Sequence, residues 1–384
     1  MSRLNDLIKE LCPNGVEYKK LEDCCNILDN KRKPVSKGVR ENGEYPYYGA
    51  NGIQDYINDY IFDGEYVLVG EDGSVQTANG TPVVNWAVGK IWVNNHAHII
   101  EEIDGISLRY LYHYLQIVDV KDLIHGNIPK LNQGDFRNIK IAIPPIEIQE
   151  EIVRILDKFG ELEAELEAEL EARKSQYEFW REKLLSTGNS NQEYITLGDI
   201  GKVCMCKRIM KNETSESGDV PFYKIGTFGK QADAYISYDI FNDYKKRFSY
   251  PKKGEILVSC SGTIGRSVVF DGEDAYFQDS NIVWLSNDES KVLNKFLYYF
   301  YQTSPWNISD GGTIKRLYNN QFVSAKVPLY SLEEQKKIVN ILERFDKLIN
   351  DITVGLPAEI ELRRKQYEYY RNKLLSFEEL SVSE

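Results

Sequence analysis

The chain repeats itself, and this repeat limits the possible folds more than any other feature of the sequence. Three segments of the first half return in the second half: Gly126–Phe136 as Gly312–Phe322 and Ile146–Phe159 as Leu332–Phe345, both at an offset of 186 residues, and Gln176–Ser186 as Gln366–Ser376 at an offset of 190. Such self-similarity means that one structural unit occurs twice. We therefore expect two globular modules of about 145 residues, each followed by a long helix.

The modules are expected to be mixed in secondary structure, which makes the fold class α+β. Short apolar runs bounded by Gly, Asn and Asp are typical of strands. Such runs lie at Glu65–Gly70, Lys90–Asn95, Glu255–Cys260 and Asn281–Ser286. Apolar residues at helical spacing predict one short helix in each module and one at the N-terminus. These helices are expected over Leu108–Val118, Lys291–Gln302 and Leu4–Leu11.

Two long helices, over residues 146–186 and 332–377, are predicted from apolar positions that recur at steps of three and four. Arg173 and Arg363 interrupt the two stripes at corresponding places, and the second stripe holds one additional four-residue step. Such a step is a stutter, which relaxes left-handed supercoiling. The predicted seam consists of Ile152, Ile155, Phe159, Leu162, Leu166, Leu170, Tyr177, Trp180 and Leu184 in the first helix and Ile338, Ile341, Phe345, Leu348, Ile352, Tyr367, Tyr370 and Leu374 in the second.

The two long helices differ in the middle. Leu162–Arg173 reads "LEAELEAELEAR", a four-residue unit in three copies, whose leucines continue the seam while its glutamates face solvent. The second helix has "TVGLPAE" at the corresponding place, with Gly355 and Pro357. Proline removes a backbone donor and clashes with the preceding turn. We predict an unbroken first helix and a kink or break near Val354–Pro357 in the second.

The order of modules and helices predicts an antiparallel helix pair. The first helix ends shortly before module two begins, so a second helix that pairs with it must run back toward module one. The modules would then lie at the two ends of a rod with a pseudo-twofold axis. Residues 147–185 at about 1.5 Å per residue span roughly 58 Å. Since B-form DNA rises about 3.4 Å per base pair, that length corresponds to on the order of 17 base pairs.

Composition predicts an intracellular protein. No run of eighteen apolar residues occurs, and the N-terminal residues lack the apolar centre of a signal peptide, so we expect a cytoplasmic location. The six cysteines form no CxxC pair and no zinc-type ladder. A net charge of −12 argues at first against a nucleic-acid partner, but residues 147–186 contribute −6 of it. Local basic clusters elsewhere are hidden by the sum.

The sequence contains no catalytic or cofactor-binding motif that we can identify. A GxxxxGK[ST] phosphate loop, an Asn/Asp-Pro-Pro-Tyr/Phe segment and a glycine-rich methyl-donor fingerprint are all absent. Glu71 and Asp72 could be metal ligands of a nuclease, but the corresponding loop of module two has no carboxylates. His96 and His98 have a spacing that could hold a metal, yet no third ligand is near in sequence. We expect no catalytic residue, no metal and no cofactor.

Two segments that lead into the long helices are the most distinctive in the chain. They are "KIAIPPIEIQEEIVRILDKF" (Lys140–Phe159) and "AKVPLYSLEEQKKIVNILERF" (Ala325–Phe345). With "GKIWVNNHAHII" (Gly89–Ile100) and the central four-residue repeat, they make nearly the whole chain resemble the specificity (S) subunit of Type I restriction–modification systems. The interruption at Gly355 and Pro357 departs from a smooth helix pair.

The resemblance implies a function and a set of partners. In that family two target recognition domains each read one half of a bipartite site in double-stranded DNA, and the helices space the domains. The helices also dock methyltransferase (M) subunits, two of which are expected, and restriction (R) subunits join the complex. The implied domains are residues 1–145 and 187–331, with helices over 146–186 and 332–377 and a tail over 378–384. The S subunit itself does no chemistry, and no membrane partner is expected.

Two other functions are compatible with the residues. One is a self-contained methyltransferase or nuclease that reads a bipartite site, and the missing catalytic motifs argue against it. The other is a coiled-coil scaffold that binds protein and not DNA, which the acidic net charge would suit.

Candidate DNA contacts are basic, aromatic and amide side chains in loops, since Lys and Arg on phosphates supply affinity and contacts to base edges supply specificity. In module one they are Lys31, Arg32, Lys33, Lys37, Arg40, Tyr48, Asn51 and Lys130. In module two they are Lys207, Arg208, Lys211, Tyr223, Lys224, Arg266, Lys315 and Arg316. The framework segments repeat between the modules but these loops do not, so we expect an asymmetric target.

Overall fold

The computed structural model describes residues 2–185, 192–308 and 315–380, which fold into two compact units. Unit 1 comprises Met1–Glu167 and Glu359–Glu384, and unit 2 comprises Ala168–Ala358. Each unit contains one globular module, here called module 1 or module 2, and a part of each long helical segment. The predicted link between the first long helix and module 2, and the end of the predicted tail, lie outside the described residues.

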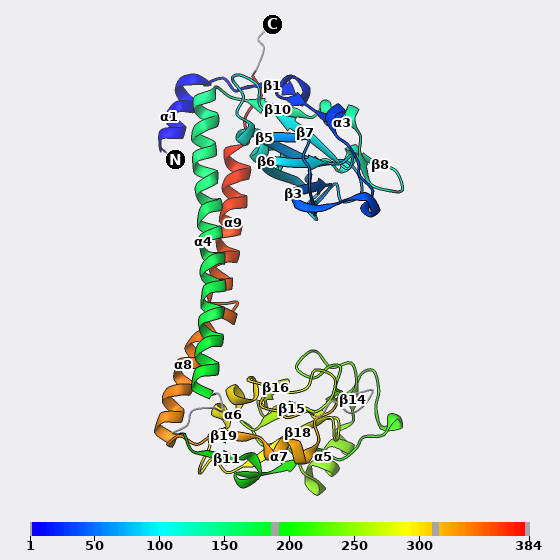
Figure 1. The fold of residues 1–384 in the computed structure, drawn as a ribbon, viewed down its shortest axis with the longest axis vertical. Coiled ribbons are helices and arrows are strands. Elements are labelled where there is room, and N and C mark those ends of the chain that lie inside the picture. Colours follow the sequence, from blue (N-terminus) through cyan, green and yellow to red (C-terminus); the bar gives the residue numbers. More distant parts are fainter. Residues whose placement is uncertain (1, 186–191, 309–314, 381–384) are drawn as a thin grey trace. The chain divides into compact units, whose positions relative to one another are not determined.

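Module 1 is built around a six-stranded sheet in the order β2-β7-β5-β6-β3-β4 (Figure 1). Neighbouring strands are antiparallel except β3 and β6, which are parallel. Consecutive residues are buried in β7 and in the second half of β5, as expected for apolar strands that are covered on both faces. The strands of unit 1 are β1 (Glu17–Lys20), β2 (Asn26–Ile27), β3 (Asn42–Gly49), β4 (Gly52–Ile57), β5 (Phe62–Gly70), β6 (Val84–Val93), β7 (Ala97–Glu101), β8 (Ile124–His125), β9 (Lys130–Leu131) and β10 (Lys140–Ile143).

The helices of unit 1 confirm the predicted leading helix and the predicted helix after residue 107. The side chain of Ser107 caps the second of these by accepting from the Tyr110 N–H. Short 3-10 turns connect the strands: η1 (Leu21–Asp23), η2 (Asp29–Lys31), η3 (Lys37–Val39) and η4 (Lys121–Leu123). The helices are α1 (Ser2–Leu11), α2 (Leu108–Leu115), α3 (Gln133–Arg137), the first part of α4 (Ile146–Leu185) and most of α9 (Leu356–Leu374).

Module 2 divides its strands among a four-stranded sheet, β12-β18-β15-β16, a three-stranded sheet, β14-β13-β17, and an antiparallel pair, β11-β19. Its strands are β11 (Tyr194–Thr196), β12 (Gly201–Cys204), β13 (Val220–Tyr223), β14 (Tyr235–Ile236), β15 (Ile256–Ser259), β16 (Ser267–Val269), β17 (Tyr276–Phe277), β18 (Ile282–Asn287) and β19 (Lys326–Pro328). Its helical elements are η5 (Leu197–Asp199), η6 (Lys211–Glu213), α5 (Tyr238–Arg247), α6 (Asn294–Tyr301), α7 (Asn319–Ser324) and α8 (Leu332–Asn350). The helix predicted over Lys291–Gln302 is confirmed as α6, whereas α5 was not predicted.

A buried glutamine joins each module to the start of its long helix. In unit 1, Gln149 accepts from the Ser107 N–H and donates to the Pro144 carbonyl. In unit 2, Gln335 accepts from the Leu293 N–H and donates to a carbonyl of the chain leading into α8. Both glutamines are 0% exposed. Because a buried amide must satisfy its hydrogen bonds, this residue explains why the segments leading into the long helices are so similar, and it confirms the internal repeat.

The predicted difference between the long helices is confirmed. α4 runs unbroken over forty residues. The second segment is broken: α8 ends at Asn350 and α9 begins at Leu356. A Cβ atom at Gly355 would lie 2.6 Å from the Asp351 carbonyl oxygen and 2.7 Å from that of Lys347, so glycine permits the close backbone approach at the break. Within the described ranges, no helix is both long and apolar enough to cross a membrane.

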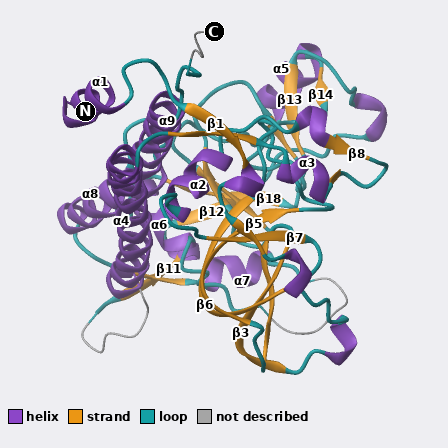
Figure 2. Ribbon diagram, turned by 90° about the horizontal axis from the view of Figure 1, so that it is seen from above, coloured by secondary structure: helices purple, strands orange, loops and turns teal. Residues whose placement is uncertain are grey.

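The helices pair antiparallel inside each unit. In unit 1 the first part of α4 lies alongside α9 (Figures 1 and 2), where Phe159 stacks on Tyr370 and Arg364 pairs with Glu163. In unit 2 the end of α4 contacts α8, through Tyr177 and Phe345 among others. Residues later in α4 therefore contact residues earlier in the second segment, as predicted.

The predicted phase of the second seam is wrong at three positions. Ile341, Leu348 and Ile352 are 44%, 37% and 81% exposed. The buried side chains of α8 lie one position later, and they include Leu342 and Ile349. α8 is apolar over more than one stripe, and the stripe that faces module 2 is buried. The other predicted seam residues are buried or half-buried: Ile152, Ile155, Phe159, Leu162, Leu166, Leu170, Tyr177, Trp180, Leu184, Ile338, Phe345, Tyr367, Tyr370 and Leu374.

Candidate nucleic-acid interface

The basic loop of module 1 runs from η2 through η3 to the start of β3. The side chains of Lys31, Lys33 and Lys37 are exposed. Nζ of Lys33 lies 5.9 Å from the centre of the Trp92 ring, which is within reach of a cation–π contact. These three ammonium groups lie at the surface and are accessible to an anionic ligand such as a phosphate.

The two arginines of this loop are bound within module 1. Arg32 donates to a carboxylate oxygen of Glu71 at 2.5 Å and to the Ala97 carbonyl at 2.7 Å, and its side chain is only 11% exposed. Arg40 donates to the carboxylate of Asp55 at 3.2 Å. Both guanidinium groups therefore hold the loop in place, and they offer less to an external ligand than the three lysines do.

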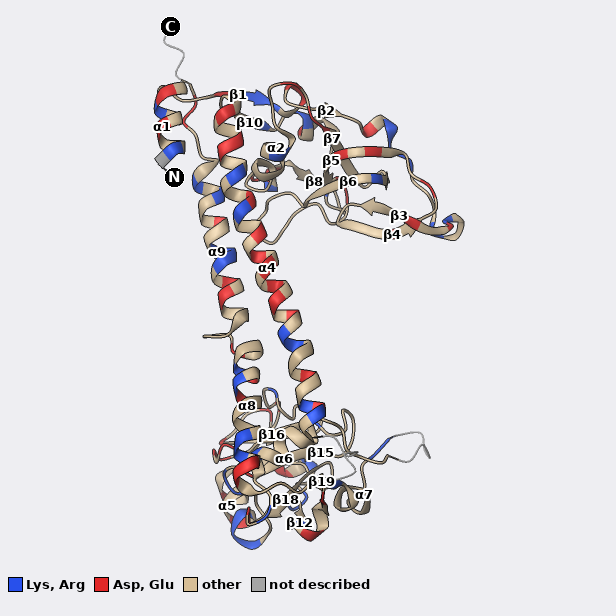
Figure 3. Ribbon diagram, turned by 60° about the vertical axis from the view of Figure 1, so that its left-hand side comes forward, with Lys and Arg blue, Asp and Glu red and all other residues tan. Residues whose placement is uncertain are grey.

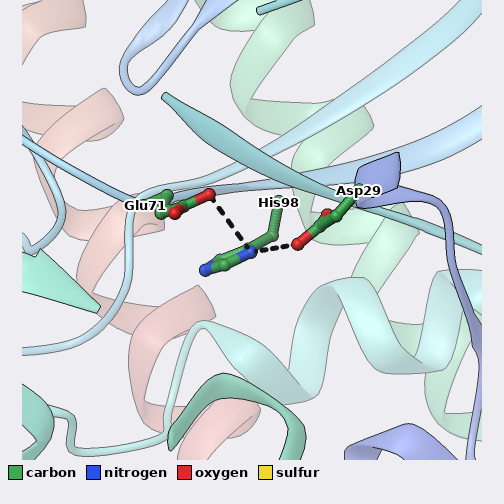
Figure 4. A group of neighbouring side chains, drawn as sticks. All are labelled: Asp29, Glu71 and His98. Atoms are coloured by element: carbon green, nitrogen blue, oxygen red, sulfur yellow. Dashed lines mark hydrogen bonds and ion pairs between the residues drawn. The ribbon is translucent and has the colours of Figure 1, made fainter. Parts of the chain in front are cut away.

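A buried ionic cluster lies beneath the loop (Figure 4). Nδ1 of His98 is 2.7 Å from Oδ2 of Asp29 and 3.6 Å from Oε2 of Glu71. Nε2 of His98 is 2.9 Å from the Leu131 carbonyl oxygen. A carbonyl oxygen can only accept, so Nε2 carries a proton. The ring also stacks on Phe136, with ring centres 4.1 Å apart.

Both carboxylates of the cluster are ionised near neutral pH. Burial opposes ionisation of Asp29, but the hydrogen bond from His98 and the charges of His98 and Arg32 outweigh it and lower the pKa of Asp29. Burial likewise opposes ionisation of Glu71, and its bond from Arg32 and the nearby positive charges lower the pKa of Glu71. The Asp29 carboxylate lies within hydrogen-bond distance of Nδ1 of His98, and it also accepts a hydrogen bond from the Ile99 N–H.

Three residues of this cluster have the donor atoms of a metal site. Ligand atoms of Asp29, Glu71 and His98 lie within 4.8 Å of one another. Yet both nitrogens of His98 already have hydrogen-bond partners. The carboxylates face Arg32 and Lys130, and Nζ of Lys130 lies 3.1 Å from Oε1 of Glu71. These two cations already balance the two carboxylates and leave no need for a further positive charge. We interpret the cluster as an ion-pair network.

Sequence reasoning missed this cluster. It considered His96 and His98 as a pair, but His96 lies before β7 and bonds Asp72. The carboxylate partners of His98 are Asp29 in η2 and Glu71 directly after β5, both distant in sequence. Lys130 is the member of the network that reaches the surface, since its side chain is 48% exposed.

The aromatic and amide candidates of module 1 have different environments. Tyr48 is 8% exposed and belongs to the core of the sheet, so its ring is not available as a surface contact. Asn51 is exposed in the turn between β3 and β4. The prediction for Tyr48 did not anticipate the apolar cluster in which this ring packs with Phe62 and Ile91 from β5 and β6.

An open groove of about 810 Å³ lies beside the basic loop. Its lining includes Lys33 and Arg40 from the loop, Gln54 from β4, and Asn94 and Asn95 from the turn after β6. Amide side chains can both donate to and accept from the edge of a base, and cations at the margin suit phosphates. Sequence reasoning missed the amides, because β4 and the turn after β6 are distant in sequence and meet only in the folded sheet.

The first basic cluster of module 2 is exposed. Lys207 and Lys211 are exposed, and the side chain of Arg208 is 66% exposed although its Nε lies 3.0 Å from Asp279. An ion pair of such exposure is weak and can exchange its partner for a phosphate at little cost. The last turn of α5 adds three basic residues (Figure 3).

The remaining candidates of module 2 are engaged within the module. Nζ of Lys224 lies 2.8 Å from Asp233. The half-buried Arg266 and Arg316 donate to backbone carbonyls at 2.9 and 2.7 Å. Tyr223 is half-buried and stacks on a neighbouring ring, while Lys315 is exposed. The two arginines brace loops in the same way as those of module 1.

Comparison with known proteins matches both halves of the chain to one family. The model of the Type I restriction modification DNA specificity domain matches residues 13–172 and again 189–362. A putative type I restriction enzyme specificity subunit of Haemophilus influenzae is 52% identical over 97% of this chain and 98% of its own length. The specificity subunit of the Escherichia coli type I restriction enzyme EcoR124I/EcoR124II is 33% identical over 70% of this chain and 71% of its own length.

Solved structures show the same fold at low sequence identity. The Type I restriction–modification S subunit of M. genitalium has a TM-score of 0.54 and 16% identity, and the match covers 94% of this chain and 96% of that one. The specificity subunit of Thermoanaerobacter tengcongensis has a TM-score of 0.51 and 13% identity, with 95% and 97% of the two chains covered.

Proposed function

Because the chain belongs to the family of Type I restriction–modification DNA specificity subunits, we propose that it selects the DNA target of such a complex by reading an asymmetric bipartite site. The observation that carries this proposal is the double occurrence of the family domain, once over each globular module. The modules share a framework but differ in their exposed loops, which suits two different half-sites. Module 1 with residues 1–145 and module 2 with residues 187–331 are the proposed target recognition domains.

The proposed phosphate contacts are the exposed cations described above. In module 1 they are Lys31, Lys33, Lys37 and Lys130, with Asn51 at the neighbouring turn. In module 2 they are Lys207, Arg208, Lys211 and Lys315. Arg32, Arg40, Arg266 and Arg316 support these loops through internal hydrogen bonds. Replacing one exposed lysine should weaken binding to all sequences alike and reduce the salt dependence of binding.

The chain itself is proposed to be non-catalytic and to work in the cytoplasm with partner subunits. Its exposed helix faces would receive M subunits, with two per chain expected from the internal repeat, and R subunits would join for cleavage. One structural neighbour comes from a study of complex assembly and conformational transition of the type I restriction–modification system. The M subunits would supply methyl transfer to adenine, while this chain supplies the choice of site.

The length of α4 is proposed to set the number of base pairs between the half-sites. Its middle carries the four-residue repeat, whose acidic residues follow one another along the helix (Figure 3). The glutamates of the repeat are exposed except Glu163, which is half-buried and pairs with Arg364. Deletion of one unit, Leu166–Glu169, removes about 6 Å of helix, which corresponds to nearly two base pairs. The gap of the preferred site should shrink by that amount while both half-sites keep their sequence.

The test is methylome sequencing of cells that co-express the chain with the methyltransferase subunit of the same system. The unaltered chain should direct adenine methylation to one bipartite motif, and the deletion variant to the same half-sites at a shorter gap. A motif with an unchanged gap would refute the role of α4 as a spacer. Methylation without any bipartite motif would refute the proposed function as a whole.

A further inference from the structure

One amide in the groove of module 1 has its orientation fixed by a chain of hydrogen bonds. The backbone N–H of His96 donates to Oδ1 of Asn94 at 2.8 Å. A backbone N–H can only donate, so the acceptor atom of this amide must be its oxygen. Nδ2 of Asn94 then donates to Oε1 of Gln54 at 3.3 Å. Asn94 is 2% exposed, so its position is determined by the protein.

The same chain of bonds settles which end of Gln54 is available. Because Asn94 donates through its Nδ2, the atom of Gln54 that accepts this hydrogen bond must be Oε1. The Nε2 group of Gln54 can then donate to another partner. No hydrogen bond from this Nε2 is found among the described residues. Gly49 contributes to the placement, because a Cβ atom at that position would lie only 2.0 Å from Nε2 of Gln54. The amide of Gln54 therefore lies over Gly49. Gln54 is exposed and belongs to the lining of the groove.

We propose that Gln54 is a specificity-determining residue that reads an adenine in the half-site bound by module 1, and that Asn94 is the positioning residue that orients it. Adenine presents N7 as an acceptor and N6–H as a donor in the major groove. Nε2 of Gln54 donates to N7, and the second lone pair of Oε1 accepts from N6–H. The proposal rests on the proposed function, since it assumes that DNA occupies this groove.

The other polar groups of the groove are less suited to this role. Arg40 has donors bonded to Asp55 and to the Val35 carbonyl. Lys33 is a single point charge at the margin, which suits a phosphate better than a base edge. Asn95 is exposed, but among the described residues no hydrogen bond fixes the orientation of its side chain. A reader that is held in one orientation discriminates between bases better than one that can rotate.

Three substitutions separate the proposed roles, with the chain assembled with its methyltransferase subunit and the methylome as the readout. Gln54→Ala removes the reader, so one A·T position of a single half-site should become degenerate. Gln54→Glu replaces the donor by an acceptor, so the same position should shift toward C·G, since a carboxylate accepts from cytosine N4–H. Asn94→Asp keeps the acceptor for the His96 N–H but loses the donor to Gln54. The amide of Gln54 should then rotate so that Nε2 donates to the new carboxylate and Oε1 faces the base, and this oxygen can accept from adenine or cytosine.

The expected size of each change is about 5- to 150-fold in preference at that one position, the range of a good bidentate contact. Gln76→Ala is the matched control, because Gln76 is an exposed amide of unit 1 that does not line the groove. The half-site that does not change serves as an internal test of folding and assembly.

Several outcomes would overturn the inference. An unchanged motif with Gln54→Ala would remove Gln54 from recognition while leaving the proposed function intact. Equal weakening at every site, or loss of all methylation by the three variants, would make the pair a structural element. If the unaltered chain directs no bipartite methylation, the proposed function fails and this inference fails with it.

Discussion

The two modules share one backbone framework, but at an equivalent buried position module 1 has charged side chains and module 2 has apolar ones. The Leu131 N–H donates to the Glu71 carbonyl in module 1, and the Leu317 N–H donates to the Cys260 carbonyl in module 2. Glu71 and Cys260 therefore hold equivalent positions. The first is an ionised carboxylate paired with cations, while the second is a buried thiol whose pKa is raised by burial to about 11.

The register of the strands extends this equivalence to the whole cluster. β2 pairs with β7 as β12 pairs with β18, which aligns His98 with Val283. Continued past the ends of the two edge strands, the same register aligns Asp29 with Met205. Cys260, Val283 and Met205 pack in the apolar core of unit 2. The sheet itself therefore does not need the ion pairs. They are particular to module 1, where they hold the loop that carries the exposed lysines.

Removing one member of the ionic cluster should have the largest effect. Asp29→Leu removes the carboxylate that pairs with Arg32, and it leaves Nδ1 of His98 and the Ile99 N–H without their buried hydrogen-bond partner. Breaking a buried ion pair from one side costs about 3–5 kcal/mol. Urea unfolding followed by circular dichroism should show this loss. Met205→Leu, the matched change in module 2, should cost less than about 1.5 kcal/mol. Equal losses of stability in the two variants would contradict the proposed difference between the modules.

Exchanging the whole cluster for its apolar counterpart should restore most of that stability. The variant Asp29→Met/Glu71→Cys/His98→Val places the residues of module 2 at the equivalent positions of module 1. Replacement of a buried ionic group by well-packed apolar residues is often neutral or stabilising, by about 1–4 kcal/mol. Arg32 would have to turn to solvent, as the equivalent Arg208 does. DNA affinity should still fall, because Arg32 and Lys130 lose their anchor.

Acid provides a second measurement on the same variant. The pKa values of Asp29 and Glu71 are lowered in the folded state, so their contribution to stability is present above the ordinary carboxyl values of 3.8 and 4.5 and is lost as pH falls through the folded values. The unaltered chain should therefore lose more unfolding free energy between about pH 5 and pH 3 than the exchanged variant does. Parallel acid profiles would show that the cluster is not ionised as described.

The sequence predicted features that repeat, and it missed features that depend on contact between distant segments. The long helices, their antiparallel course and the break at Gly355 follow from periodicity and from proline chemistry, which are local properties of the chain. The ionic cluster does not, because η2, the residue after β5 and β7 each contribute one member, and nothing in the sequence indicates that these three segments meet. The proposed role of Gln54 is hidden for the same reason, since Asn94 reaches it from the turn after β6.

The error in the seam of α8 has a related cause. Periodicity shows that a helix has an apolar face, but α8 has apolar residues on more than one stripe, and which stripe is buried is decided by the module against which it packs. Ile341 and Leu342 are adjacent and equally apolar, yet one is 44% and the other 0% exposed. The sequence of α8 alone does not show which of these two side chains is buried, because the contacts that bury Leu342 come from α6 and from the end of α4.

The smallest predicted effect compares one glycine in each long helical segment. Gly160 lies inside α4, and a Cβ atom there would meet no atom within 4 Å, so Gly160→Ala should stabilise unit 1 by about 0.5–1 kcal/mol through reduced backbone entropy. Gly355→Ala should act in the opposite direction, because its Cβ atom would lie 2.6–2.8 Å from three carbonyl oxygens. Thermal unfolding of the two single variants measures both signs. Stabilisation by Gly355→Ala would mean that the break between α8 and α9 can close into a continuous helix. The residue at position 355 would then be the reason why the second segment is broken while α4 is not.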